Sequence, residues 1–279
     1  MLDVSNANRH DGSFERALDT MSLIDDKSDI AAAFGKAALS YDKHAAFQRE
    51  VGEKLIELMP LDLTGKTVID LGCGTGYFSK LLSDRGAFVL CVDISDSMLS
   101  QAKVRCGSHD MAYLVADAES LPIETKSVDY VFSSLALQWC QDLSVPMREI
   151  RRVLKKSGQA YFSTLLDGSL HELKESWKKV DKYQHINHFD SSNQVKIALA
   201  QSQFSDITLD FSKITVWYDS AFAVMRDLKG IGANHVSGRS QGLTSRKALI
   251  KVEQEYQVFK NHQNQLPVTY QVCLGALYR

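Results

Sequence analysis

Hydrophobic residues follow two alternating patterns over most of this chain. Short apolar runs that end in an acidic or small polar residue are separated by segments in which apolar positions recur every three or four residues, as at Phe78, Leu81 and Leu82. The runs are typical of buried strands, and the longer spacing is typical of helices that pack on a sheet. Because the two alternate, we predict an α/β fold with a mainly parallel sheet of seven strands and helices on both faces. The predicted strands are 68–70, 88–93, 112–117, 127–133, 159–164, 207–218 and 266–278.

The two ends of the chain depart from this pattern. Residues 1–29 are polar and have no periodic apolar positions, so we expect a mobile tail before one domain over 30–279. The insertion between the last two predicted strands, about 219–264, predicts a helical lid near the C-terminus, at the edge of an active site. The predicted helices are 30–45, 51–58, 77–85, 148–156, 170–180, 194–203 and about 244–260.

A glycine-rich loop follows the first predicted strand. Residues 68–77 read VIDLGCGTGY, with glycines at 72, 74 and 76. Glycine has no Cβ, so it adopts positive φ and lets a ligand approach the backbone. The strand before the loop and the helix after it place that ligand at a helix N-terminus, outside the carboxyl end of a parallel strand. A dinucleotide fingerprint needs a small residue where this chain has Tyr77, which disfavours a dehydrogenase.

The loop resembles the first motif of class I S-adenosylmethionine methyltransferases and is followed by acids in matching order. Asp93 ends the second predicted strand, 17 positions beyond Gly76, and its carboxylate can accept hydrogen bonds from both ribose hydroxyls. Asp117 ends the third predicted strand, where the resemblance implies a bond with the adenine amino group. The residues that the resemblance assigns to the cofactor are Tyr41, Gln48, Asp70, Gly72, Cys73, Gly74, Gly76, Asp93, Ile94, Met98, Asp117, Ala118 and Leu135.

Three of these assignments concern particular parts of the cofactor. Residues 30–50 resemble the N-terminal helix that covers S-adenosylmethionine in part of this superfamily, which brings Tyr41 to the cofactor. The backbone N–H of Ala118 is expected at the adenine ring, and Met98 on its face. The backbone carbonyls around Leu135 are expected at the methionine amino group.

Composition and charge exclude several other classes of protein. The chain has 279 residues, a net charge of −2 and five scattered cysteines without a Cys-x-x-Cys pair. These features indicate neither a disulfide framework nor a cysteine-rich zinc site. No apolar run approaches the length of a membrane span, and the first 20 residues are too polar for a secretory signal. We therefore expect a protein of the reducing cytoplasm, without a metal and without a membrane or nucleic-acid partner.

Basic residues are concentrated in two stretches. Residues 148–156 hold five bases and one acid, and residues 226–251 hold six bases and one acid. Such stretches fit a local anionic partner. For the first of them, a solvated helix face explains the charges equally well.

Several motifs beyond the glycine loop resemble the malonyl-[acyl-carrier protein] O-methyltransferase family of biotin synthesis. The resemblance covers Ile30 to the C-terminus and is most specific in the lid. It implies that the enzyme methylates the free carboxylate of a malonyl group, carried by acyl carrier protein or by coenzyme A, in an early step of biotin (pimeloyl) synthesis. The motifs are AFGKAA at 33–38, LQW at 137–139, GSLHEL at 168–173, MRDLKGIGA at 225–233, LTSR at 243–246 and LPVTY at 266–270.

The implied chemistry needs no general base, because a malonyl carboxylate is already ionised at pH 7. We expect Arg226 to hold this carboxylate, since its planar guanidinium matches a carboxylate in a bidentate manner, whereas Lys229 offers a point charge. Arg226 can instead pair with a neighbouring acid in the lid, and Lys229 or the basic stretches can face the carrier protein. Gln138 and Trp139 are expected to wall the reacting methyl group, and His235 to line the pocket.

Two other functions remain open from the residues alone. A methyltransferase of a small molecule, such as a quinone precursor, predicts an apolar lid, which the bases of 226–251 disfavour. A non-catalytic module with this fold usually lacks one of the glycines or the ribose acid. This chain has Gly72, Gly74, Gly76 and Asp93.

Overall fold

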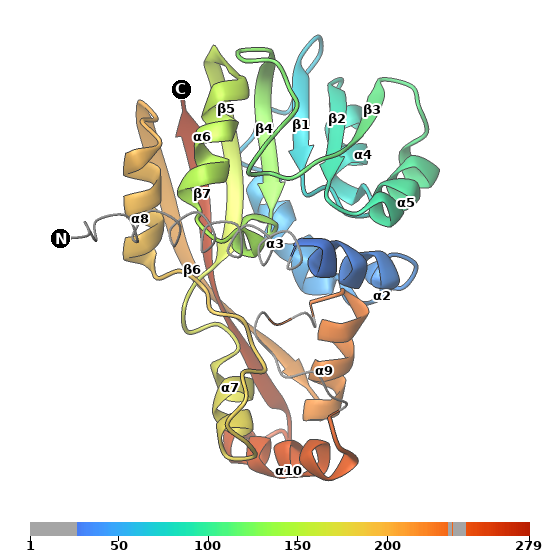
Figure 1. Cartoon of the computed structure of the whole chain (residues 1–279), viewed down its shortest axis with the longest axis vertical. Helices are drawn as coiled ribbons and strands as arrows, with labels where there is room; N and C mark the ends of the chain where they lie inside the picture. The colour runs from blue at the N-terminus through green and yellow to red at the C-terminus, as the bar shows by residue number, and fades with distance from the viewer. Residues whose placement is uncertain (1–26, 234–235, 237–243) are drawn as a thin grey trace, which may run out of the picture.

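The computed structural model describes residues 27–233, 236 and 244–279, and its centre is one seven-stranded sheet. The strand order is β3-β2-β1-β4-β5-β7-β6 (Figure 1), in which β1 to β5 pair in parallel and β7 runs antiparallel to both neighbours. This arrangement confirms the predicted fold class. The strands are β1 (Thr67–Leu71), β2 (Phe88–Asp93), β3 (Met111–Val115), β4 (Val128–Ser134), β5 (Leu154–Leu165), β6 (Asp206–Tyr218) and β7 (Leu266–Tyr278).

Helices cover both faces of the sheet and the edge at which the parallel strands end. Residues 27–37 are helical, and short 3-10 helices lie at Leu137–Trp139 and Gln257–Phe259. In the part of the chain that the structure describes, no helix is long and apolar enough to pass through a membrane. The α-helices are α2 (Tyr41–His44), α3 (Ala46–Ile56), α4 (Tyr77–Asp84), α5 (Asp96–Cys106), α6 (Ser144–Val153), α7 (His171–Lys178), α8 (Ser192–Gln201), α9 (Ala221–Gly230) and α10 (Arg246–Tyr256).

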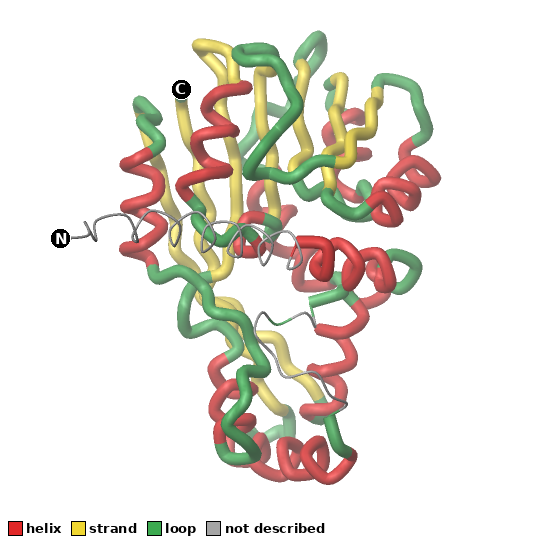
Figure 2. Tube along the Cα trace, in the orientation of Figure 1, coloured by secondary structure: helices red, strands yellow, loops and turns green. Residues whose placement is uncertain are grey.

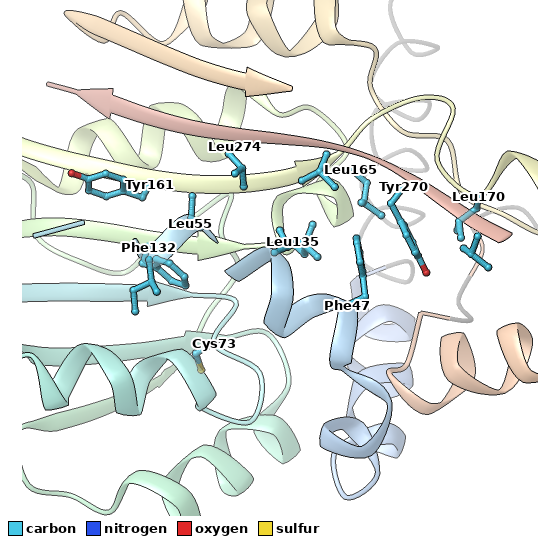
Figure 3. Packing of buried hydrophobic residues seen from close by; sticks show 14 of the residues in the cluster. Phe47, Leu55, Cys73, Phe132, Leu135, Tyr161, Leu165, Leu170, Tyr270 and Leu274 are labelled. Carbon is cyan, nitrogen blue, oxygen red and sulfur yellow. The ribbon is translucent and has the colours of Figure 1, made fainter. Parts of the chain in front are cut away.

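Two hydrophobic layers fix these helices on the sheet. One layer joins α6 and α8 to the strands through residues such as Ile150 and Leu199. The other joins α3 and α4 to the opposite face and continues beyond the sheet. In this second layer (Figure 3), the ring of Phe47 on α3 stacks on Tyr270 of β7, with centroids 3.8 Å apart. The covering helix is therefore anchored to the last strand by a buried aromatic pair.

The long antiparallel strands β6 and β7 carry a second lobe below the sheet (Figures 1 and 2), in which α7, α9 and α10 surround their far ends. Buried Glu172 of α7 accepts hydrogen bonds from the Thr269 backbone N–H at 3.1 Å and its hydroxyl at 2.5 Å. On the other side, the ring Nδ1 of His44 lies 2.7 Å from Asp227 Oδ1 and ties α2 to α9. The segment predicted as a lid thus contributes α9 and α10 to this lobe, and its role as a lid stays a prediction.

Several predicted helix boundaries are wrong: α3, for example, begins at Ala46 and not at residue 51. The helix predicted over 148–156 ends at Val153, and β5 begins at Leu154. The reason is pairing with the neighbouring strand: Leu154 is in register with Val128, and Lys155 lies 2.8 Å from Asp129. The first helix includes residues 27–29, which we expected in the tail, and the predicted helix 30–45 is interrupted by a turn at 38–40.

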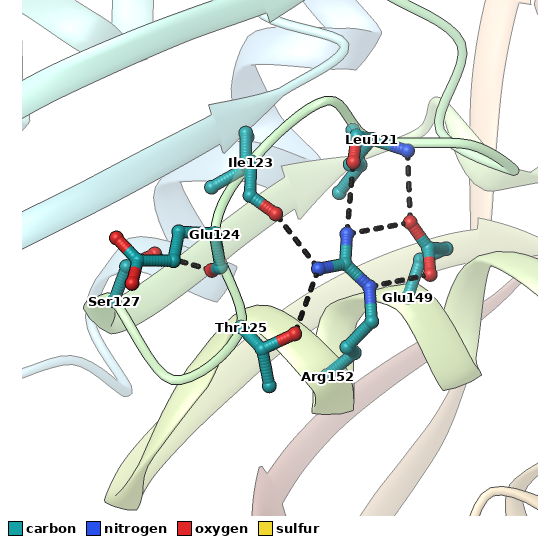
Figure 4. A network of polar contacts seen from close by, with 7 residues as sticks. All are labelled: Leu121, Ile123, Glu124, Thr125, Ser127, Glu149 and Arg152. Atoms are coloured by element: carbon teal, nitrogen blue, oxygen red, sulfur yellow. Dashed lines mark hydrogen bonds and ion pairs between the residues drawn. The ribbon is translucent and has the colours of Figure 1, made fainter.

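Most of the bases in the first basic stretch, residues 148–156, form hydrogen bonds within the protein. Arg152 donates to both oxygens of Glu149 at 2.7 and 2.8 Å and to the carbonyls of Leu121 and Ile123 at 2.8 and 2.7 Å (Figure 4). Glu149 also accepts from the Leu121 backbone N–H at 2.8 Å. The hydrogen bonds from Arg152 and Leu121 outweigh the effect of burial and lower the pKa of Glu149. These contacts clamp the 121–125 connection onto α6, so an intramolecular role explains this stretch better than an anionic partner.

The Arg152→Met variant should lower the free energy of unfolding by about 2 kcal/mol, because the change leaves Glu149 and two backbone carbonyls without their charged donor. Urea unfolding followed by circular dichroism measures the loss. Arg148→Met is the matched control, since Arg148 donates to the hydroxyl of Ser144 in the same helix, and its effect should stay within about 0.5 kcal/mol. Equal losses of unfolding free energy in both variants would contradict the role of Arg152 in holding residues 121–125 on α6.

Candidate functional site

The three glycines of the loop after β1 have different structural roles. All three have positive φ, between +54° and +80°. A Cβ on Gly72 would lie 2.2 Å from the Cβ of Ala136, and a Cβ on Gly76 would lie 2.9 Å from that of Ala102. A Cβ on Gly74 would meet no atom within 4 Å. Gly72 and Gly76 therefore permit close packing, while Gly74 is open to a ligand.

A cavity lies between this loop, the ends of the parallel strands and the helices over residues 27–44, and we call it the sheet-edge pocket. Its wall is mostly apolar with a few polar groups, as is usual for small-molecule and cofactor sites. Ten of the residues predicted for the site line it: Tyr41, Gly72, Gly74, Asp93, Ile94, Met98, Asp117, Ala118, Leu135 and Trp139. Gly76, which we expected at the cofactor, is not among the lining residues, because it packs against α5 and caps the N-terminus of α4.

Two carboxylates lie buried beside the glycine loop. Asp93 accepts from the backbone N–H of Gly74 at 2.9 Å and of Ser95 at 2.8 Å, and burial raises its pKa to about 6. Asp70 accepts from the hydroxyl of Ser79 at 2.6 Å, and burial raises its pKa to about 7. Both carboxylates are held in fixed positions with little water around them. They fit a ligand that offers hydroxyl donors or a positive charge.

A smaller pocket continues from the sheet-edge pocket on the far side of the glycine loop. Asp70, Cys73 and Gln48, all predicted for the cofactor, line it. Arg49 lines it too, and its guanidinium donates to the Asp42 carbonyl at 2.8 Å. The sequence analysis missed Arg49, although it directly follows Gln48 in the segment predicted to cover the cofactor. A guanidinium at this point offers a binding group for a carboxylate.

The opposite end of the sheet-edge pocket holds a second missed residue. Lys27 lines the pocket and its ammonium group contacts both Asp117 and Glu119. Burial lowers the pKa of Lys27, but the hydrogen bonds with the two carboxylates outweigh it, so the pKa is raised. Lys27 was missed because residues 1–29 have no apolar period that would predict a helix. The first helix therefore reaches the end of the pocket where Asp117 lies.

A second cavity, which we call the lobe pocket, lies between the first helix, α2 and α3 on one side and the second lobe on the other. It shares Phe34, Tyr41, Leu135 and Trp139 with the sheet-edge pocket, so the two cavities meet there. Leu135 has a φ of +51°, unusual for a residue with a Cβ, and its N–H donates to the backbone oxygen and hydroxyl of Ser163 at 3.1 and 3.0 Å. Such strained residues concentrate at functional sites.

Two predicted glutamines supply polar atoms to the lobe pocket. Gln138 donates from Nε2 to the Leu135 carbonyl at 2.8 Å, and Gln48 lies on α3. The Oε1 atoms of both side chains are buried and have no hydrogen-bond partner in the structure. Most of the remaining wall is apolar. His185 and Asn187 of the connection between α7 and α8 also line this pocket, and the sequence analysis missed both.

The two predicted bases of the lid are not brought to either pocket. Arg226 and Lys229 are exposed on α9 and line a separate hollow against the first helix, with Lys36 and His44. Leu228 and Ile231 of the same segment line the lobe pocket. Positions two residues apart point about 160° apart around a helix, so α9 cannot present Arg226 and Leu228 to the same cavity. His235 lies outside the described residues.

Among residues 27–233, 236 and 244–279, no group of three or more histidine, cysteine or acidic side chains is arranged to hold a metal ion. The five cysteines are unpaired. The groups that line the two pockets offer hydrogen bonds that can bind and orient a ligand. The open glycine, the two buried carboxylates and the guanidinium fit a nucleoside that carries an amino acid.

The strand order, the glycine loop and the two joined pockets together define a methyltransferase domain, and residues 69–162 match the family described as "Methyltransferase domain". The chain is 40% identical to a malonyl-[acyl-carrier protein] O-methyltransferase of Serratia marcescens, over 91% of its own length and 96% of that protein. It belongs to the malonyl-[acyl-carrier protein] O-methyltransferase family.

Two further comparisons extend this result. The chain is 37% identical to the biotin biosynthesis bifunctional protein BioHC of Cellvibrio japonicus, over 91% of this chain and 50% of that protein. The solved structure of YcgJ from Bacillus subtilis superimposes with a TM-score of 0.61 at 17% identity and covers 83% of this chain and 98% of that one. The second likeness concerns the fold alone.

Proposed function

We propose that this protein transfers a methyl group from S-adenosylmethionine to the free carboxylate of malonyl-acyl-carrier protein, which gives the methyl ester, in an early step of biotin synthesis. The observation that carries the proposal is the junction of two cavities at Phe34, Tyr41, Leu135 and Trp139. One cavity has the polar groups of a nucleoside site and the other is mostly apolar. The near full-length likeness to malonyl-[acyl-carrier protein] O-methyltransferases supports this choice of acceptor.

In this proposal the sheet-edge pocket holds S-adenosylmethionine, which supplies a methyl group activated on a sulfonium sulfur. The Asp93 carboxylate accepts hydrogen bonds from the ribose hydroxyls, and Asp117 with the Ala118 N–H binds the adenine. Ile94 and Met98 line the adenine part of the cavity. The loop backbone at 72–74, Asp70, Gln48 and the Leu135 carbonyl surround the methionyl part. Arg49 pairs with its carboxylate, since it is the one lysine or arginine among the described residues that line the smaller pocket.

The acceptor carboxylate enters the lobe pocket and meets the methyl group at the junction. A malonyl carboxylate is ionised at neutral pH and attacks directly, so no protein group has to remove a proton. The aromatic rings of Phe34 and Trp139, which meet edge to face at 5.1 Å, exclude water from the junction. Opposite charges on the two reactants cancel as the bond forms, and a dry cavity favours that step. Alignment at the junction supplies the remaining acceleration.

Among the exposed bases of the hollow beside α9, Arg226 receives a different role from the one we expected, whereas Lys229 keeps the role of facing the carrier protein. Arg226, Lys229 and Lys36 lie on the outer side of the same two elements whose inner sides line the lobe pocket. A cationic surface at that place suits an acidic carrier protein whose acyl arm enters the pocket. We therefore propose that these bases contact the carrier, while the substrate carboxylate is bound inside.

Incubation of the purified protein with radiolabelled S-adenosylmethionine and malonyl-, acetyl- or unloaded carrier protein tests the proposal. We expect label only on the malonyl form, as a base-labile methyl ester, because only that form has a free carboxylate. Label transferred to a quinone precursor and not to any carrier would favour the small-molecule methyltransferase. Cofactor binding without transfer to any acceptor would favour a non-catalytic module.

A further inference from the structure

His185 has the one imidazole among the described residues that line the lobe pocket, and it is held from two sides. Its Nε2 lies 2.9 Å from Oδ1 and 3.1 Å from Oδ2 of Asp181. Its ring stacks on Trp177 of α7, with centroids 3.6 Å apart and an angle of 10° between the planes. The side chain is only 8% exposed. Both the position and the plane of the ring are therefore fixed, and Nδ1 is the ring nitrogen that these contacts leave for a ligand.

The rest of the described wall contains no lysine or arginine. Its polar side chains are those of Tyr41, Tyr270, Trp139, Asn187 and the two glutamines, and its other members are apolar. Moving an ionised carboxylate from water into such a cavity is costly unless a charged or strongly donating group receives it. Of the described lining residues, only His185 can carry a positive charge. The contact of Asp181 with Nε2 fixes the ring so that Nδ1 is turned away from that carboxylate.

We propose that His185 binds the acceptor carboxylate through Nδ1–H and that Asp181 and Trp177 are positioning residues for its ring. This assignment rests on the proposed function and names the group inside the lobe pocket that selects a carboxylate over a neutral acyl end. The selection arises because a neutral amide in the same place has no negative charge and cannot form an ion pair with a ring that carries protons on both nitrogens. His185 takes the role that the sequence led us to expect for Arg226.

The test compares the equilibrium binding of malonyl-carrier protein with that of malonamyl-carrier protein, in which a terminal amide replaces the carboxylate. Both are measured with S-adenosylhomocysteine bound. We expect the unaltered protein to prefer the carboxylate by about 10- to 100-fold, the size of one charge-assisted hydrogen bond. His185→Gln should reduce the preference to about 3-fold or less, and Asp181→Asn should reduce it by a smaller factor. His188→Gln is the matched control, because His188 lies on the same segment, is exposed and does not line the pocket.

Affinity for S-adenosylhomocysteine shows whether each variant is folded, since His185 does not line the sheet-edge pocket. His185→Asn serves as a second variant if His185→Gln fails this check. A preference for the carboxylate that survives the loss of His185 overturns the proposal, and so does an unaltered protein that binds both carriers equally. Failure of the proposed function is a separate result: the unaltered protein would then not methylate malonyl-carrier protein at all.

Discussion

Replacing Asp93 by alanine should weaken the binding of S-adenosylmethionine by about 100-fold or more. The carboxylate is buried, and the backbone N–H groups of Gly74 and Ser95 hold both its oxygens in place. It thus offers its remaining lone pairs to two ribose hydroxyls without having to reorganise. Each hydrogen bond to a charged group contributes roughly 1.5–3 kcal/mol, so the loss of two amounts to at least two powers of ten in affinity.

Isothermal titration calorimetry with S-adenosylmethionine measures this effect. Asp96→Ala is the matched control, because Asp96 is an exposed acid three positions further on and does not line the pocket. Its affinity should stay within about 3-fold of the unaltered protein. An Asp93→Ala variant that is folded and binds the cofactor normally would remove Asp93 from the ribose site.

The second large effect concerns stability. Asp70→Asn should make the ligand-free protein more stable at pH 8, by roughly 2–4 kcal/mol, and at the same time weaken cofactor binding. Burial raises the pKa of Asp70 to about 7 from an ordinary value of 3.8, so the folded state binds this proton more tightly than the unfolded state. The stability that the protonated carboxyl provides is present at pH 4 and is lost as the pH rises to about 7. Asparagine stays neutral and keeps the hydrogen bond from Ser79.

Urea unfolding of the ligand-free protein at pH 5 and pH 8 measures this difference. The stability gain of the variant should be larger at pH 8 than at pH 5. Asp167→Asn, at an exposed acid, should show no such dependence on pH. A variant at Asp70 that is less stable than the unaltered protein at pH 8 would show that the buried charge is compensated in the folded state.

Such a cost is expected where a site must bind a cation. The ionised carboxylates of Asp70 and Asp93 would each have a lower free energy in water than in the folded protein. Both lie beside the loop proposed to hold the sulfonium cofactor. Functional sites commonly contain groups that lower the stability of the unliganded protein. The same two carboxylates therefore account for a prediction on affinity and a prediction on stability.

The sheet followed from the sequence because parallel strands buried on both faces require continuous apolar runs. Residues 266–278 were predicted as a strand and form β7 over that range. The end of α6 was not predictable in the same way. Basic residues such as Arg152, Lys155 and Lys156 are compatible both with an exposed helix face and with the start of a strand. There the long-range pairing of Leu154 with Val128 decides the structure.

The site could be predicted as far as it depends on one continuous loop and on the ends of parallel strands. Gly74, Asp93 and Asp117 come to one pocket because the strand order places those ends side by side. Lys27 and His185 reach the pockets through tertiary packing, which local spacing does not encode. For Arg226, residue chemistry suggested a substrate ligand, but the direction of α9 determines which cavity the side chain faces, and no motif reports that direction.

A crystal structure of the complex with S-adenosylhomocysteine and malonyl-carrier protein would test the central claim most directly. We predict that the sulfur of S-adenosylhomocysteine lies at the junction of Phe34, Tyr41, Leu135 and Trp139. The malonyl carboxylate should lie in the lobe pocket, against His185. A malonyl group bound in the hollow of Arg226 and Lys229, or a nucleoside outside the sheet-edge pocket, would contradict the account.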